Sequence, residues 1–228
     1  MIKEDEWFNK MKEINSIGGT LVLEKSKYDE IILSNQNFKI PHKQRDKEKK
    51  EIDNDSNDFF PEIVDLSFNK RNENSHYNSL ITNLSIWISY VKEKQKNGYL
   101  DAYDLYRYVA ENILNILSGY KEKTKRIAIY VNKSTNEIYG IIIYDTVTGE
   151  LSWSLTTPKN VFNIKEEEYI KYKMQNTYNL CAYKIGAILR IYALTQLFNM
   201  HKVSKVISRS ISNKGALGLR MIGFENKE

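Results

Sequence analysis

Cys181 is the residue of this chain best suited to covalent chemistry. It is the only cysteine in the sequence, and a thiolate at a helix N-terminus is stabilised and nucleophilic. His76 and His201 are available as bases, so one hypothesis is a Cys–His hydrolase. The competing interpretation is a small buried cysteine with unrelated surface histidines. Because the three histidines are scattered along the chain, the sequence predicts no metal site.

Composition favours an intracellular protein with a sizeable core. The chain has 228 residues, 41% of them hydrophobic, which suits one large domain or one domain with an added lobe. Its 34 basic and 29 acidic residues give a net charge of +5, which permits an acidic partner such as a coenzyme, a nucleotide or RNA. One cysteine excludes an intramolecular disulfide, and we expect neither a signal peptide nor a membrane-spanning segment. A cytoplasmic location is therefore expected.

The amino-terminal third carries the weakest patterns. Residues 7–14 predict a short helix, and residues 20–23 predict a strand after two glycines. The run 42–57 is almost entirely polar, which is typical of a solvated loop; the alternative is a basic arm that touches phosphate. Residues 59–68 predict an extended segment, with Pro61 favouring an edge position. We expect residues 1–68 to form an atypical extension and residues 69–228 to form the main domain.

The middle of the chain predicts two helices followed by three strands. Apolar residues recur with helical periodicity over 80–91 and 105–117. Residues 127–131 and 138–144 predict a hairpin, and 151–155 predict a third strand. Three tyrosines flank the second helical stripe and either line a cleft or belong to the core: Tyr103, Tyr106 and Tyr108.

The last quarter predicts a buried helix, a strand and a short closing helix. Residues 182–199 are apolar on almost every side, so this helix is expected to lie against a sheet. Its main polar interruptions are Lys184, Arg190, Gln196 and Asn199. Residues 203–211 predict a further strand.

The closing segment from Ser212 to Glu225 has a spaced pattern. Asn213 is followed at intervals of three by Ala216 and Leu219, and then by the pair Gly223-Phe224. The general interpretation is a short amphipathic helix with a glycine C-cap. The pattern also resembles the closing motif of the GNAT acyltransferase superfamily, where it follows a central strand and opens the last main helix.

The order of the predicted elements from about residue 78 is also similar to that family. The resemblance implies a mixed α/β domain with a central, mostly antiparallel sheet flanked by helices. In that family the fourth strand splays from the fifth, and the pantetheine arm of an acyl-coenzyme A enters between them. Acetyl-CoA is therefore the implied acyl donor, with its pyrophosphate at the N-terminus of the following helix.

The implied coenzyme loop follows the family pattern only in part. That pattern is Arg or Gln, two residues, Gly, one residue, and Gly or Ala; over residues 181–186 only Gly186 matches, since Cys181 and Lys184 replace the other two. The alternative for Gly186 is close packing of a helix on the sheet, and that for Asn213 is a helix N-cap. The resemblance implies these coenzyme-binding residues: Leu155, Thr156, Lys184, Ile185, Gly186, Ala187 and Asn213.

The resemblance also suggests where a base and an acid would lie. The family's base is a carboxylate or a water held by a strand residue, and the nearest polar residues here are Glu150, Ser152, Ser154 and Thr156. Of these, Glu150 and Ser154 join Cys181 as candidate catalytic residues. The alternative for each is a solvated or edge position. The tyrosine that serves the family as acid is replaced by Arg220, and no tyrosine follows Tyr192.

The expected function is acyl-CoA-dependent N-acyl transfer. An amine of a protein, an aminoacyl-tRNA or a small molecule would attack the acetyl-CoA thioester directly in a ternary complex, with strand amides near Leu155 and Thr156 stabilising the oxyanion. The alternative is a catalytically inactive domain of the same fold that recruits a protein or nucleic-acid partner. The sequence leaves the acyl acceptor and the oligomeric state open.

Overall fold

The computed structural model describes residues 20–34, 61–67, 75–94, 102–119, 123–132, 137–157, 185–210, 213–220 and 222–227. The helix predicted at 7–14, the polar run 42–57, Cys181 and Lys184 lie outside these ranges, as does the side chain of Asn213. Every structural statement below concerns the described residues.

A seven-stranded sheet forms the centre of the molecule, in the order β2-β3-β4-β5-β6-β1-β7. The strands are β1 (Thr20–Glu24), β2 (Pro61–Ser67), β3 (Lys125–Asn132), β4 (Ile138–Asp145), β5 (Glu150–Thr156), β6 (Lys205–Arg209) and β7 (Glu225–Asn226). Neighbouring strands pair antiparallel except β5 and β6, which pair parallel. The predicted fold class, a mixed α/β domain with a mostly antiparallel sheet, is confirmed.

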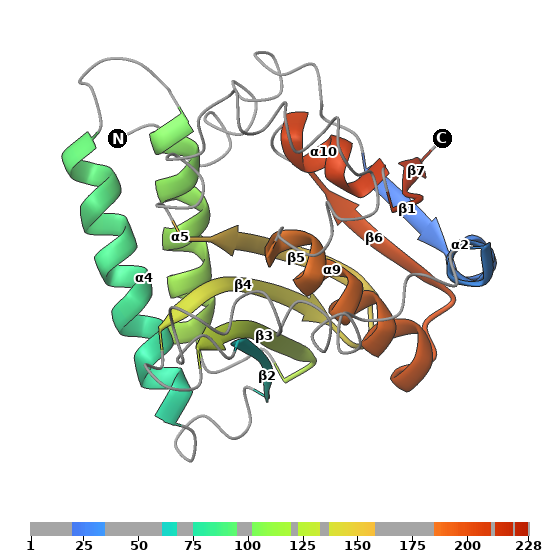
Figure 1. Ribbon diagram of the computed structural model, residues 1–228, viewed down its shortest axis with the longest axis horizontal. Coiled ribbons are helices and arrows are strands. Elements are labelled where there is room, and N and C mark those ends of the chain that lie inside the picture. The colour runs from blue at the N-terminus through green and yellow to red at the C-terminus, as the bar shows by residue number, and fades with distance from the viewer. Residues whose placement is uncertain are drawn as a thin grey trace, which may run out of the picture.

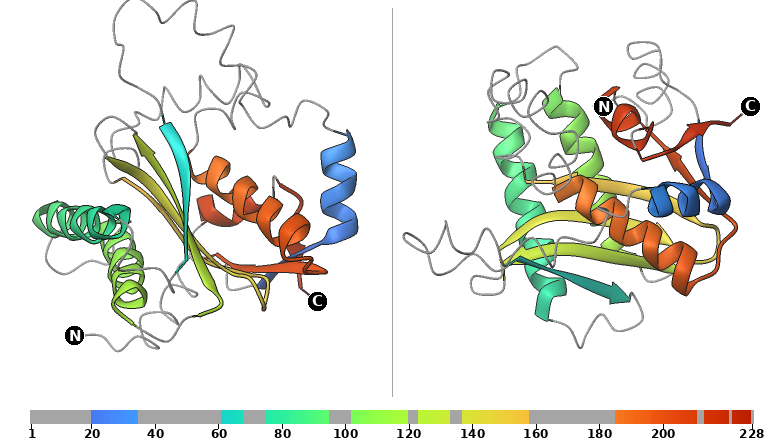
Figure 2. Two further views of the ribbon diagram at one scale, coloured as in Figure 1. Left: turned by 90° about the horizontal axis from the view of Figure 1, so that it is seen from below. Right: turned by 45° about the vertical axis from the view of Figure 1, so that its right-hand side comes forward.

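Helices cover both faces of this sheet (Figures 1 and 2). On one face lie α4 (Ser75–Lys94) and α5 (Ala102–Ser118). On the other lie α2 (Lys25–Ser34), α9 (Ile185–Thr195) and α10 (Asn213–Arg220). The last turn of α9 continues as the π-helical segment η2 (Gln196–Met200). Each face of the sheet therefore has its own layer of helices and its own apolar core.

The two cores contain the apolar residues whose spacing predicted the helices. The α4 and α5 stripes are buried against the sheet through Leu80, Leu84, Trp87, Ile88, Val91, Val109, Ile113 and Leu117. On the opposite face, α9 and η2 bury Leu189, Ala193, Leu194, Leu197 and Phe198. Between them, β4 is buried on both faces over most of its length, as its largely apolar sequence requires.

Two strands of the sheet come from the segment that the sequence assigned to an extension. β1 lies between β6 and β7 and pairs with both of them. β2 ends the sheet order on the other side, and its first residue is Pro61, so the predicted edge position is confirmed. The strand predicted at 20–23 is also confirmed. The central sheet therefore depends on residues 20–24 and 61–67.

α10 ends in a Schellman motif. Gly223 has φ of 93°, the N–H of Phe224 bonds to the carbonyl of Leu219 (3.2 Å), and the N–H of Gly223 bonds to the carbonyl of Arg220 (3.0 Å). Leu219 and Phe224 are buried in the same core, which is the apolar contact that accompanies this motif. The glycine C-cap predicted from the closing pattern is confirmed.

Gly223→Ala tests this helix end. Its positive φ disfavours an L side chain, and a Cβ at this position would overlap Cδ1 of Ile31 on α2. We expect a loss of about 1–3 kcal/mol in the free energy of unfolding, measured by chemical denaturation. The control is Gly119→Ala, whose Cβ would lie 3.5 Å from the carbonyl oxygen of Asn115, an ordinary contact. Equal stability of the two variants would contradict this account of α10.

Candidate functional site

β5 and β6 start side by side and then part. Only two residue pairs join them, Glu150 with Ile207 and Leu151 with Ser208. Beyond these pairs β5 runs toward α5, whereas β6 runs toward α10 (Figure 1). We call the region where the two strands no longer pair the splay. It lies over residues 152–156 of β5, at the carboxyl end of that strand.

A β-bulge changes the hydrogen-bond partner of β5 at the splay. Trp153 pairs with Ile143 of β4, but Tyr144 pairs with Leu151, so Ser152 is an extra residue in β5. Before the bulge Leu151 pairs with β6, and after it the strand pairs with β4 alone. Bulges of this kind redirect the groups of a strand and occur frequently beside functional sites.

The bulge leaves two backbone amides directed at the splay. The N–H of Thr157 bonds to the carbonyl of Tyr139 on β4 (3.0 Å), so the backbone N–H of Thr157 points toward β4. The direction of the backbone N–H alternates from residue to residue along a strand. The N–H of Leu155 therefore also points toward β4, whereas the N–H groups of Ser154 and Thr156 point away from it. No described strand pairs with them on that side. Within the described residues, both N–H groups thus point toward the splay.

Tyr106 of α5 fixes the end of β5. Its hydroxyl donates to the carbonyl oxygen of Thr156 at 2.6 Å. Burial raises the pKa of Tyr106 far above the ordinary value of a phenol, so the hydroxyl stays protonated and remains a donor. One layer outward, Trp153 makes an edge contact with Tyr108, with 5.9 Å between the ring centroids. The tyrosines that flank the α5 stripe thus include one that holds the strand at the splay.

α9 begins directly against this part of the sheet. A Cβ on Gly140 of β4 would lie 2.5 Å from Cγ2 of Ile185, so a glycine there allows the helix to approach. At Gly186, by contrast, a Cβ would meet only Cγ2 of Thr156, at 3.9 Å. Close packing therefore does not require glycine at 186. The first turn of α9 and the end of β5 form one surface.

Asp65 ties α9 to the edge of the sheet. Its carboxylate accepts hydrogen bonds from Nε of Arg126 (2.9 Å) and from the hydroxyls of Tyr144 (2.5 Å) and Tyr192 (3.0 Å). Burial, together with the charge of Asp65, raises the pKa of both tyrosines. Tyr192, the last tyrosine of the chain, is therefore a protonated donor to Asp65.

The structure brings only some of the predicted site residues to the splay. Ser154 lies opposite Ile142, whose side chain is in the α9 core, so it shares the α9 face with Thr156. Leu155 is on the other face, buried in the α5 core, and its amide faces β4. Glu150 stands at the other end of β5, roughly 20 Å from Thr156 at about 3.3 Å per residue. The positions of Ile185, Gly186 and Ala187 are on the first turn of α9.

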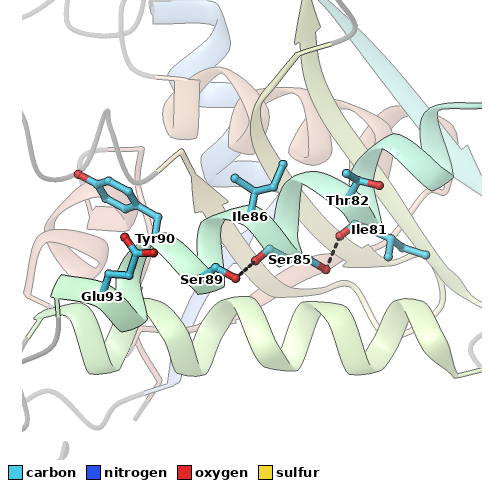
Figure 3. Close-up of a pocket in the computed structure, with 7 residues that line it drawn as sticks. All are labelled: Ile81, Thr82, Ser85, Ile86, Ser89, Tyr90 and Glu93. Carbon is cyan, nitrogen blue, oxygen red and sulfur yellow. Dashed lines mark hydrogen bonds between the residues drawn. The ribbon is translucent and has the colours of Figure 1, made fainter.

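Two further features lie away from the splay. Arg220 is exposed and donates to Oδ1 of Asn226 at 3.1 Å. A surface hollow of about 550 Å³ runs along the outer side of α4 between Ile81 and Glu93, where Ser85 and Ser89 bond to carbonyls of their own helix (Figure 3).

In the described ranges no cluster of His, Cys, Asp and Glu could hold a metal ion, and no helix has the length and hydrophobicity to cross a membrane.

One functional candidate was not singled out by sequence reasoning. Arg190 lies on α9 and its guanidinium reaches α10: a Cβ on Gly218 would lie 2.6 Å from Nη1 of Arg190. The available signal was a charged residue in the middle of an otherwise apolar helix. Asp65 gave a similar signal, as an acidic residue within a strand.

Comparisons with known proteins give a weak structural likeness. No family model matches the chain, and no curated protein sequence matches it significantly. It is similar to a tandem GNAT protein from the clavulanic acid biosynthesis pathway, solved without acetyl-CoA, with a TM-score of 0.47, 11% identity, and coverage of 92% of this chain and 50% of that one. It is also similar to a functionally unknown conserved protein from Staphylococcus epidermidis, with a TM-score of 0.37, 15% identity, and coverage of 100% and 65%.

The chain thus spans half of the tandem GNAT protein and about two thirds of the second protein. With both TM-scores below 0.5 and both identities below 25%, neither likeness assigns a function.

Tyr106→Phe tests the bond that holds the end of β5. The variant leaves the partly buried Thr156 carbonyl without its phenolic donor, so we expect a loss of about 1–2 kcal/mol in unfolding free energy. Tyr139→Phe is the matched control, because that hydroxyl donates to Glu137 at the surface. Hydrogen exchange of the Thr157 amide should also accelerate in the first variant alone. An unchanged stability and exchange rate would show that the bond does not fix the strand.

Proposed function

We propose that this protein is an acyl-CoA-dependent N-acyltransferase that works at the splay. The observation that carries the proposal is the parting of β5 from β6, after which the N–H groups of Ser154 and Thr156 point away from β4, beside the start of α9. Two fixed N–H donors beside a helix N-terminus suit a ligand with a polarised carbonyl and an anionic group. The closing motif and the order of elements support the same proposal.

The proposed reaction is a direct transfer. The neutral amine nitrogen attacks the thioester carbonyl carbon, and the carbonyl π electrons move to oxygen to give a tetrahedral oxyanion. The oxyanion then collapses, the carbon–sulfur bond breaks, and the coenzyme leaves as a thiolate while the new amide loses its proton to solvent or a base. The N–H group of Thr156 stabilises the oxyanion, because it is held by the sheet before the substrate binds. The N–H group of Ser154 lies two residues, or about 6.6 Å, back along the strand, so it can bind only a different acceptor of the ligand.

The described side chains at the splay supply positioning more than proton transfer. Tyr106 and Tyr192 are committed to Thr156 and Asp65, and Glu150 is at the far end of the strand. Among the described residues, the hydroxyls of Ser154 and Thr156 are the groups on the α9 face of β5 that could orient a water as base. Rate enhancement in this proposal comes chiefly from alignment of the amine and the thioester.

A second candidate function is a binding domain without catalysis. It is favoured by Arg220, which stands in the place of the family's tyrosine and here is exposed and bonded to Asn226. In this case the same surface would hold a coenzyme or another anionic ligand, but no amine would be acylated. Binding and turnover measured on one preparation separate the two candidates.

Acetyl-CoA binding to Gly186 variants tests the proposal. Gly186→Ala adds a Cβ that makes only ordinary contact with Thr156, so we expect its unfolding free energy and coenzyme affinity to stay near those of the wild type. Gly186→Trp fills the surface at the start of α9, and we expect at least a tenfold loss of affinity in isothermal calorimetry.

Turnover is followed as release of free coenzyme thiol in the presence of protein, aminoacyl-tRNA and small-molecule amines. Binding without thiol release would favour the binding domain. No binding and no thermal stabilisation of the wild type at millimolar acetyl-CoA would contradict the proposal, since a ligand that binds the folded state must raise its apparent stability.

A further inference from the structure

Arg190 is a guanidinium placed between two helices. It lies one turn after Gly186 on α9, and residues four apart share one face of a helix. Gly186 faces Thr156 of β5, so Arg190 projects from the face of α9 that is turned toward the splay. Its Nη1 reaches the backbone of α10 at Gly218, where a Cβ would lie 2.6 Å away. A glycine at 218 thus leaves room for the charged group.

No described residue neutralises this charge. The ion pairs of the described arginines join Arg107 to Asp104 and Glu111, and Arg126 to Asp65. Arg190 has neither an ion pair nor a hydrogen bond with any described residue. Burial lowers its pKa, and no described residue supplies an opposing charge. A cation that is partly removed from water without a partner costs free energy, which an oxyanion in the same place would recover.

We propose that Arg190 is an anion-binding residue, which holds a phosphate or carboxylate group of the ligand that binds at the splay. The guanidinium has a planar set of donors that fits either oxyanion in a bidentate manner. If the ligand is an acyl-coenzyme A, which rests on the proposed function, the group is one of its phosphates. Arg190 then supplies the positive charge that the loop at 181–186 lacks at its first position. If the ligand is another small molecule, the group is its own phosphate or carboxylate.

The experiment compares three variants in isothermal calorimetry with three probes. Arg190→Met removes the charge and keeps the length of the side chain. Gly218→Ala keeps the charge but forces Nη1 to move, because the new Cβ would lie 2.6 Å from it. Lys205→Met is the control: it also removes one positive charge, but from an exposed position at the start of β6. The probes are acetyl-CoA, inorganic pyrophosphate and succinate, and denaturation curves show that each variant is folded.

We expect the wild type and Lys205→Met to bind at least one probe with equal affinity. Arg190→Met should bind it about tenfold to a hundredfold more weakly, the range expected when a charged hydrogen bond is lost. Gly218→Ala should show a smaller loss of affinity, and it keeps the test valid if Arg190→Met fails to fold. Preference for pyrophosphate or for succinate identifies the oxyanion.

The outcomes separate this inference from the proposed function. Binding of pyrophosphate or succinate through Arg190, without any binding of acetyl-CoA, would sustain the inference and defeat the acyltransferase proposal. If the wild type, Arg190→Met and Gly218→Ala bind acetyl-CoA with equal affinity, the coenzyme binding of the proposed function is supported and the anion-binding role of Arg190 is overturned. Failure of the wild type to bind any of the three probes at millimolar concentration would overturn the anion-binding role.

Discussion

The structure depends on a change of hydrogen-bond partner within one strand. β5 bonds to β6 through Leu151, passes one extra residue at Ser152, and from Trp153 onward bonds to β4 alone. Alternate residues of a strand direct their N–H and C=O groups toward opposite neighbouring strands. Because a bulge inserts one extra residue, it exchanges the side toward which each later residue directs these groups. The bulge therefore decides that the N–H groups of Ser154 and Thr156, and not that of Leu155, point to the side where β6 has parted from β5.

The elements around the splay hold this irregularity in place from both faces of the sheet. On one face Tyr106 binds the carbonyl of Thr156, and on the other α9 packs on Gly140 and begins beside Thr156. Asp65 fixes α9 to β2, β3 and β4 by three hydrogen bonds. Because these contacts come from both helical layers, the amides at the end of β5 are positioned before any ligand arrives, which is the condition for electrostatic stabilisation by backbone donors.

Sequence reasoning recovered the features that depend on local periodicity. The stripes of α4 and α5, the β3–β4 hairpin and the glycine cap of α10 follow from side-chain patterns that repeat within a few residues. It did not recover the position of β1 between β6 and β7, because these pairings join residues 181 to 205 positions apart and the short strand carries no mark of its neighbours. The helix at Lys25–Ser34 was also missed, since its apolar residues form no continuous stripe.

The site was predictable only in part, because its geometry depends on strand pairing as well as on local sequence patterns. The turn of α9 at Gly186 and the end of β5 at Thr156 came from a motif. The facing of Leu155 toward β4 depends on the bulge at Ser152, which also moves the side chains of odd-numbered residues from the α9 core at Leu151 to the α5 core at Leu155. Sequence alone did not indicate the extra residue. Glu150 looked close to Thr156 in sequence, but an extended strand places its two ends far apart.

The most direct measurement of the central claim is an amide NMR titration of the labelled protein with acetyl-CoA. The account predicts that the N–H resonances of Ser154, Thr156 and Gly186 shift together with one affinity, while those of Ile129 and Ile143 in the sheet interior stay in place. Shifts that instead fall on the outer side of α4, between Ile81 and Glu93, or an absence of shifts at millimolar coenzyme, would contradict it.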